Sequence, residues 1–214
     1  MHTNVLHITN GECFNAYFLQ KWGGDALPFC EAMMDGDATE DILSDAFISL
    51  RTRALGVDEA TYRAKLGVCD ALAQHAYTSL SLYFGKDTFC QMNLLTLLAY
   101  LEQIGYSGDV VLNYIDDASF AIIEDGIPVH LGAYRQLYRE ILLEKQMPRE
   151  VGVLVPEAIT LYFDYRAENG YLARLVKAHP DLDAEALTVL LLKASAAYGL
   201  SDTQAKRLIQ SCRA

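Results

Sequence analysis

Short apolar runs alternate with segments of helical periodicity over the first two thirds of the chain, and this alternation constrains the fold more than any other feature. The runs predict strands over 5–8, 26–31, 79–84 and 109–115. The periodic segments between them predict helices over 39–54, 58–76 and 88–104. Strands joined through helices form parallel sheets with right-handed crossovers. We therefore expect an α/β fold of Rossmann-like type, with a largely parallel open sheet and flanking helices.

Two local signals refine this sheet. Pro28 lies within the strand 26–31, and because proline donates no ladder hydrogen bond, that strand is expected at an edge. Asp125-Gly126 separates two further apolar runs, 120–124 and 127–130, and this dipeptide suits a tight type I′ turn. The two runs are therefore predicted to form a hairpin.

From Gly132 onward the pattern is wholly helical, and we predict two units: an α/β domain over 1–156 and a helical C-terminal unit over 157–214. Residues 157–214 carry equal numbers of acidic and basic side chains, so the whole net charge of −11 lies in 1–156. An acidic body repels phosphate backbones and anionic lipids. We expect neither nucleic acid nor a membrane as a partner.

The location is predicted from apolar length and the start of the chain. No apolar run approaches the roughly 20 residues that a bilayer span needs, and the start, Met1–Asn4, is polar. A cytoplasmic protein is expected. Its five cysteines are odd in number and widely spaced, which makes a disulfide framework an improbable arrangement.

The turns that follow the strands are the expected place for a ligand. Parallel strands bring their carboxyl ends to one edge of the sheet, where open α/β sheets bind ligands. The polar residues there that we assign to a ligand site are Thr9, Asn10, Gly11, Glu12, Glu31, Asp87 and Gln91. The same residues have a local interpretation, because Thr9-x-x-Glu12, Thr88-x-x-Gln91 and Ser201-x-x-Gln204 all fit a capping box.

Charge and thiol chemistry leave several roles open at this edge. Asn10 and Gly11 precede a helix and can present backbone amides to an anion. Glu12 and Asp87 are candidate ligands for a divalent metal, with Mg²⁺ as the candidate cofactor, although Asp87 can equally cap its helix. A phosphate beside Glu12 would need such a metal, or Lys86, to offset the carboxylate charge.

Three cysteines are expected near the same edge: Cys13, Cys30 and Cys90. A thiol at a helix N-terminus has a lowered pKa, so Cys13 or Cys90 could act as a nucleophile or a metal ligand. The alternative is that each is a small buried apolar residue.

Three segments resemble the bacterial domain-of-unknown-function family eighteen thirty-five: 5–12, 27–31 with Asp35-Gly36, and 82–94. The family carries an L-H-I-T-N-G-D start, an L-P-W-R-D stretch followed by E-G-P, and a W-F-E-x-D-x-F-D-Q-L segment. The resemblance covers about residues 5–115 and implies an α/β fold with a shared site at the seven ligand positions named above. It implies no reaction, because the family has none assigned.

The chain also departs from the family pattern. The replacements are Glu12 for aspartate, Phe29 for tryptophan, Cys30 for arginine, Asp37 for proline, Tyr83 for tryptophan, Gly85 for glutamate and Cys90 for aspartate. An arginine and two acids that could handle an anion or a metal are thus missing. If the family is enzymatic, the resemblance implies altered or lost activity here.

Three hypotheses of function follow. The first is binding of a small phosphorylated or nucleotide-like ligand at the strand carboxyl edge, with Mg²⁺ as a candidate cofactor. The second is a regulatory or protein-interaction module without chemistry, forming a homo-oligomer through the C-terminal helices. The third is a thiol enzyme or redox sensor. Whether the protein is an enzyme stays open.

Overall fold

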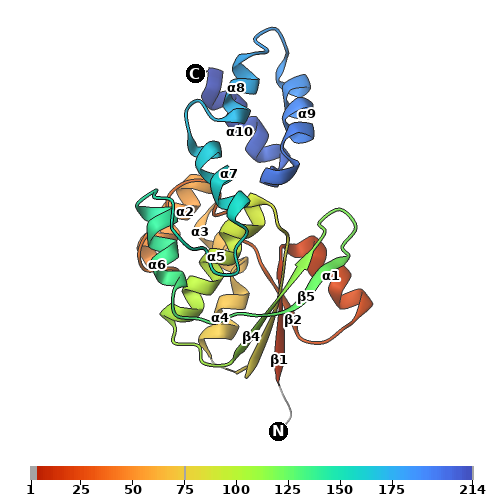
Figure 1. The fold of residues 1–214 in the computed structure, drawn as a ribbon, viewed down its shortest axis with the longest axis vertical. Coiled ribbons are helices and arrows are strands. Elements are labelled where there is room, and N and C mark those ends of the chain that lie inside the picture. Colours follow the sequence, from red (N-terminus) through yellow and green to blue (C-terminus); the bar gives the residue numbers. More distant parts are fainter. Residues whose placement is uncertain (1–3, 75, 214) are drawn as a thin grey trace.

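The chain folds into an α/β structure around one five-stranded sheet, as predicted (Figure 1). The computed structural model describes residues 4–74 and 76–213, so the predicted polar start at 1–3 and His75 of the predicted helix 58–76 lie outside it. The sheet order is β2-β1-β3-β4-β5, with β5 antiparallel to β4 and the other pairs parallel. The strands are β1, Val5–Asn10; β2, Ala26–Phe29; β3, Ser79–Phe84; β4, Asp109–Ile115; and β5, Ile122–Pro128.

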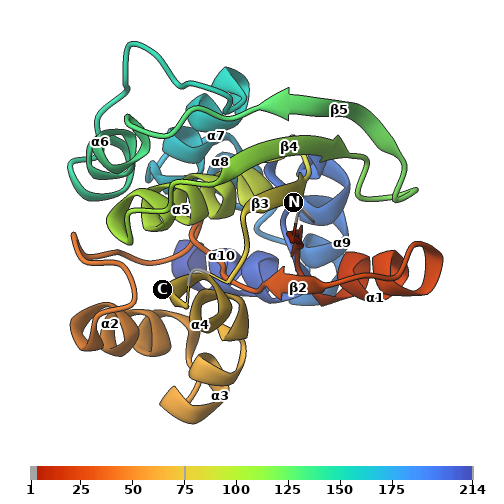
Figure 2. The same cartoon turned by 90° about the horizontal axis from the view of Figure 1, so that it is seen from below.

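Helices cover the two faces of the sheet unequally. Figure 2 shows α1 on one face and α4 and α5 on the other. The helices of this part are α1, Glu12–Lys21; α2, Asp45–Leu55; α3, Glu59–Ala64; α4, Gly67–Ala73; α5, Thr88–Gln103; and α6, Tyr134–Tyr138, continued by the π-helical turn η1, Arg139–Leu143.

Side chains alternate between the two faces of the sheet along β1, so this strand contributes to the packing on both faces. Leu6 and Ile8 are completely buried in the main core, to which α5 contributes a long run of buried side chains. His7, between them, contacts Phe18 of α1, with ring centroids 4.8 Å apart. A smaller apolar cluster on that side is built by Phe14 and Phe18 with Tyr83 of β3. The helix α5 is therefore the central element of the fold.

A helical part follows the sheet, as predicted, and lies beyond its carboxyl edge (Figure 1). It consists of α7, Pro156–Arg166; α8, Tyr171–Lys177; α9, Ala184–Ala194; the 3-10 turn η2, Ala196–Tyr198; and α10, Asp202–Arg213. Thr88 Oγ1, at the start of α5, lies 3.2 Å from Ala158 O of α7 and 3.3 Å from Ala197 O of η2. The first turn of α5 is thus held against the helical part.

Several predicted strands and helices are confirmed, and others are wrong in their bounds. The strands 79–84 and 109–115 are present, and β2 lies at the edge of the sheet, as Pro28 requires. The predicted helix 39–54 begins only at Asp45, because the Ser44 side chain caps it by accepting from Phe47 N. The predicted helix 58–76 is interrupted at Leu66, which has a non-helical backbone before Gly67.

The predicted hairpin at Asp125-Gly126 is wrong. Both residues lie inside β5, where Gly126 has a φ of 70° and its N–H donates to Asn113 Oδ1 over 3.1 Å. The pairing with β4 shifts register at this level, so the dipeptide forms a bulge instead of a turn. The chain reverses earlier, where Asp116 N donates to Ala121 O. Asp117 lies in this reversal.

Of the three predicted capping boxes, one is confirmed. Ser201 N donates to Gln204 Oε1 and Gln204 N donates to Ser201 Oγ, which is the reciprocal pattern expected. The box at Thr9 is wrong, since Gly11 precedes α1 without a side-chain cap. The box at Thr88 is also wrong, because Asp87 is the capping residue of α5.

No helix among the described residues is long and apolar enough to cross a membrane.

Candidate functional site

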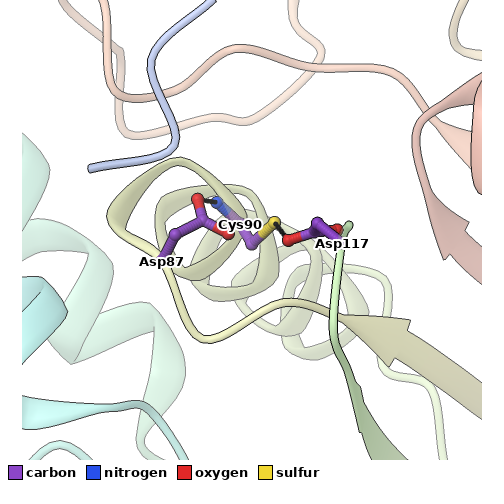
Figure 3. Close-up of side chains that lie close together, drawn as sticks. All are labelled: Asp87, Cys90 and Asp117. Carbon is purple, nitrogen blue, oxygen red and sulfur yellow. Dashed lines mark hydrogen bonds between the residues drawn. The ribbon is translucent and has the colours of Figure 1, made fainter. Parts of the chain in front are cut away.

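Two carboxylates and a thiol meet at the carboxyl edge of the sheet. The strands β1, β3 and β4 are parallel neighbours, so the segments that follow them start side by side. Asp87 follows β3, Asp117 follows β4, and Cys90 lies in the first turn of α5. One ligand atom from each of these three residues lies within 4.8 Å of the other two (Figure 3). We refer to these three residues as the Asp87–Cys90–Asp117 cluster.

Helix capping fixes Asp87 in this position. Its backbone is extended, and its Oδ1 accepts from Cys90 N over 3.0 Å, the bond that a capping aspartate makes to the first turn. Sequence reasoning left open whether Asp87 caps α5 or serves a ligand. The geometry allows both, because capping occupies Oδ1 and Oδ2 points toward the other members of the cluster.

The turn after β4 fixes Asp117. Asp116 Oδ1 accepts from Ser119 N over 2.8 Å and from Ser119 Oγ over 2.6 Å, and Phe120 N donates back to Asp116 O. Asp116 therefore closes the turn with its own side chain. Asp117 makes none of these bonds, and its carboxylate turns to Cys90, whose Sγ lies 3.5 Å from Asp117 Oδ2.

Two glycines make room for the carboxylates. A methyl group at Gly85 would lie 2.7 Å from Asp87 Oδ2 and 2.9 Å from Cys90 Sγ, and it would overlap Asp117 Oδ2. A methyl group at Gly199, just before α10, would overlap Asp87 Oδ1. Asp87 thus lies between the end of β3 and the C-terminal helical part.

Burial and like charge shift the acidity of the cluster. Asp117 is an exposed residue, yet partial burial of its carboxyl group raises its pKa to about 7, with further contributions from a hydrogen bond with Asp87 and from the Asp87 charge. The pKa of the Cys90 thiol is raised well above its ordinary value, first by burial and then by both aspartates. Cys90 is therefore a neutral thiol at pH 7, contrary to the lowering expected at a helix N-terminus.

Amide side chains support the thiol from β1. Asn10 Nδ2 donates to Cys90 Sγ over 2.9 Å, and Asn10 Oδ1 accepts from Asn93 Nδ2 over 3.0 Å. Asn93 also accepts from Met33 N, in the loop after β2. This chain of side chains connects the ends of β1 and β2 to α5.

A pocket of about 800 Å³ opens beside the cluster, and Asp117 lines it. Its other walls come from α1, the loop after β2, the end of α2, the start of α5, and α10 with the segment before it. Phe89 and Leu200 supply apolar surface, and Asp35 and Arg207 supply charge. The volume falls in the range of about 300–1,000 Å³ that is usual for small-molecule sites.

The remaining predicted residues of the first turn lie outside the cluster. Thr9 is buried, with Oγ1 3.1 Å from Asn15 Oδ1. Gly11 has a φ of 86°, which a residue with a side chain rarely adopts. Glu12, predicted as a metal ligand, is exposed and forms an ion pair with Lys65 at 2.5 Å. The structure therefore brings Asp87 together with Asp117 and not with Glu12.

Glu31 and Gln91 have structural partners. Glu31 is buried in an ion pair of 2.9 Å with Arg51, whose side chain is completely buried. The Tyr62 hydroxyl donates to the same carboxylate. Gln91 donates to Gly85 O over 2.6 Å and accepts from Val155 N over 2.9 Å, so it ties the loop after β3 to the segment before α7. Both side chains therefore hold the segments around the site in place, and neither belongs to the cluster.

Sequence reasoning did not assign Asp117, Asp35, Gln204 or Arg207 to a site. Asp117 was visible as an acid directly after a strand, but so was Asp116, and nothing local separates the two. Gln204 and Arg207 are distant in sequence, and the capping box at Gln204 concealed its second role in the pocket. The thiols differ also: Cys13 is exposed, and burial raises the pKa of Cys30 to about 11.

Comparisons of the chain with protein families, with curated protein sequences and with solved structures found no match.

Proposed function

We propose that the carboxyl edge of the sheet binds a small phosphorylated ligand through a divalent cation held by Asp87 and Asp117. The observation that carries the proposal is the convergence of these two carboxylates beside a pocket that Asp117 lines. The protein would act as a binding protein for this ligand, and no catalytic step is assigned.

The charge of the cluster supports a cation. No ion pair among residues 4–74 and 76–213 involves Asp87 or Asp117. Lys86, the sequence neighbour that could have neutralised them, pairs instead with Glu124 at 2.8 Å. Without a cation, Asp117 holds a proton below pH 7, because its pKa is raised to about 7. A divalent cation would replace that proton.

The donor set favours a hard cation such as Mg²⁺ or Mn²⁺. Carboxylate oxygens are their preferred protein ligands, and Mg²⁺ is commonly held by one or two carboxylates together with water and substrate phosphate. Zn²⁺ would bind Cys90 as a thiolate, and its binding would have to release the thiol proton, whose pKa burial and the two aspartates raise.

A cation held by Asp87 and Asp117 would also favour a phosphate group as the ligand. Two carboxylates leave most positions of an octahedral ion open to water and to a ligand. The body of the protein is strongly acidic, so a free phosphate would be repelled unless a cation came with it.

The test is to measure Mn²⁺ binding at pH 8 by calorimetry and by electron paramagnetic resonance. Asp87→Asn keeps the oxygen that caps α5, and Asp117→Asn keeps the shape of the side chain. Each is expected to lower the Mn²⁺ affinity by about tenfold or more, because each removes an ionised ligand. Asp116→Asn, the adjacent acid outside the cluster, is the matched control and should bind Mn²⁺ like the wild type. A wild-type protein that binds neither Mn²⁺ nor Mg²⁺ would disprove the proposal.

A second candidate function is self-association through the C-terminal helices. Val189 of α9 is 48% exposed and lines a groove between α9 and α10 together with Leu192 and Ile209. Residues 157–214 carry no net charge, so two copies of this surface would not repel each other as two acidic bodies would. We expect Val189→Glu to abolish any concentration-dependent dimer in sedimentation velocity. A wild type that is monomeric at high concentration would exclude this candidate.

A further inference from the structure

Two buried polar atoms, on residues that line the pocket beside the Asp87–Cys90–Asp117 cluster, have no hydrogen-bond partner. Among the described residues, Gln204 Nε2 and Asp35 Oδ2 are the buried side-chain atoms without a hydrogen bond. Gln204 is only 3% exposed, and both residues line this pocket. A buried polar group without a partner is costly, so such groups usually serve a ligand or an ordered water.

The other atoms of both side chains are already used. Gln204 Oε1 accepts from Ser201 N and Ser201 Oγ, which fixes the amide so that Nε2 is the free end. Asp35 Oδ1 accepts from the Tyr165 hydroxyl over 2.8 Å, which leaves Oδ2. The pocket therefore presents one set of N–H donors, on Gln204, and one carboxylate acceptor, on Asp35.

This pair favours a neutral partner over an anion. An anion would satisfy Gln204, but it would also face the Asp35 carboxylate. Arg207 forms an ion pair with Asp35, with Nη1 3.8 Å from Asp35 Oδ2, but this contact is too long for a hydrogen bond, so Oδ2 can still accept one from a ligand. The Nη2 of Arg207 donates to Leu55 O. A group that offers an N–H donor next to an acceptor satisfies both side chains at once. The edge of a nucleobase has this pattern.

The walls of the pocket suit a flat ring. Phe89 and Leu200 are partly buried against the main core and line the pocket, and Leu55 lines it as well. Aromatic and aliphatic side chains of this kind provide the contact surface for a base, while a few polar groups set its orientation.

We propose that the pocket binds a nucleoside phosphate, with the base at Gln204 and Asp35 and the phosphate at the cation of Asp87 and Asp117. This inference rests on the proposed function, because the cation holds the phosphate end. Asp117 lines the pocket and belongs to the cluster, so a single ligand can reach both places.

The experiment is calorimetric titration in Mn²⁺ with the four ribonucleoside 5′-monophosphates, with ribose 5-phosphate as the probe without a base and with the four nucleosides as probes without phosphate. At least one nucleotide is expected to bind about tenfold more tightly than ribose 5-phosphate, because its base would form hydrogen bonds with Gln204 and Asp35.

Three variants test the base end. Gln204→Glu keeps the oxygen that caps α10 and removes the donor, so its nucleotide affinity should fall to that of ribose 5-phosphate. Asp35→Asn keeps the acceptor for Tyr165 and replaces the free oxygen with a donor. This variant should therefore also lose the preference for the nucleotide over ribose 5-phosphate. Gln210→Glu lies on the same helix outside this pocket and should behave like the wild type.

The outcomes separate the two proposals. Ribose 5-phosphate binding as tightly as every nucleotide would overturn the base site and leave the metal site intact. Unchanged nucleotide preference in both Gln204→Glu and Asp35→Asn would overturn it as well. Nucleotide binding that depends on Gln204 but is indifferent to Mn²⁺ and to Asp117→Asn would instead overturn the proposed function.

Discussion

The carboxylates of Asp87 and Asp117 lie close together beyond the ends of two neighbouring parallel strands, β3 and β4. They meet beside Gly85, where any side chain would collide with both carboxylates. Each is fixed by its own local structure, Asp87 by capping α5 and Asp117 by the turn that Asp116 closes. Neither has a basic partner among the described ion pairs. The two therefore form a site of concentrated negative charge whose protonation depends on pH.

The contribution of Asp117 to stability should fall as the pH rises toward 7. The pKa of Asp117 is raised to about 7 in the folded state from an ordinary value near 3.8, so between these values the folded protein holds a proton that the unfolded chain has lost. The contribution of Asp117 to the free energy of unfolding therefore decreases between about pH 4 and about pH 7. Urea denaturation of the wild type and Asp117→Asn at pH 5 and pH 8 measures this. The difference between the two proteins should change with pH, and a constant difference would contradict the shift.

Mn²⁺ binding should strengthen over the same range. The metal competes with the proton on Asp117, so affinity is expected to rise from pH 6 to pH 8 and then level off. Titrations at several pH values measure this directly. An affinity that does not depend on pH would show that Asp117 is not a ligand.

Gly199→Ala should disturb the cluster through Asp87. The residue has a φ of 68°, so a side chain costs about 1–2 kcal/mol of stability, and the added methyl group would also displace the Asp87 carboxylate. Gly105→Ala is the matched control, since Gly105 has a φ of 66° and open space around it. Thermal unfolding should show a loss for both variants, but Mn²⁺ affinity should fall only for Gly199→Ala. Equal Mn²⁺ affinities would contradict the close approach of Gly199 and Asp87.

Arg51→Met should be among the most destabilising substitutions in the chain. It leaves Glu31 buried and unpaired, which costs about 3–5 kcal/mol, and it removes the bonds from Arg51 to the carbonyls of the loop that carries Asp35. Arg63→Met breaks exposed ion pairs with Glu59 and Asp45 and should change the stability little, because solvent screens exposed pairs. Urea denaturation of the two variants decides this, and similar losses would mean that the Glu31–Arg51 pair contributes little.

Thiol labelling should distinguish Cys90 from Cys13. Cys13 is exposed, whereas Cys90 is buried and its pKa is raised, so iodoacetamide at pH 7.5 should modify Cys13 first and Cys90 only upon unfolding. Mass spectrometry of the labelled peptides gives the order. Rapid labelling of Cys90 in the folded protein would instead support a reactive thiol.

The sequence by itself determined the elements whose signals are local. Apolar runs bounded by turns identified β3 and β4, the long apolar helix α5 was recognisable, and Pro28 placed β2 at an edge, because each of these depends on a few consecutive residues. The box at Ser201 and Gln204 was predictable for the same reason. The predicted edge of the sheet also follows from strands alternating with helices.

Tertiary structure alone decided how these elements are used. Asp125-Gly126 suits a turn or a bulge equally well locally, and pairing with β4 made it a bulge. Glu12 and Asp117 both follow strands, yet Lys65, more than fifty residues away from Glu12, draws that side chain to an ion pair, while the reversal after β4 turns Asp117 toward Cys90. Asp35 and Gln204 come to the same pocket only because α10 packs over the sheet edge. Convergence of residues far apart in the chain depends on packing, which no local pattern contains.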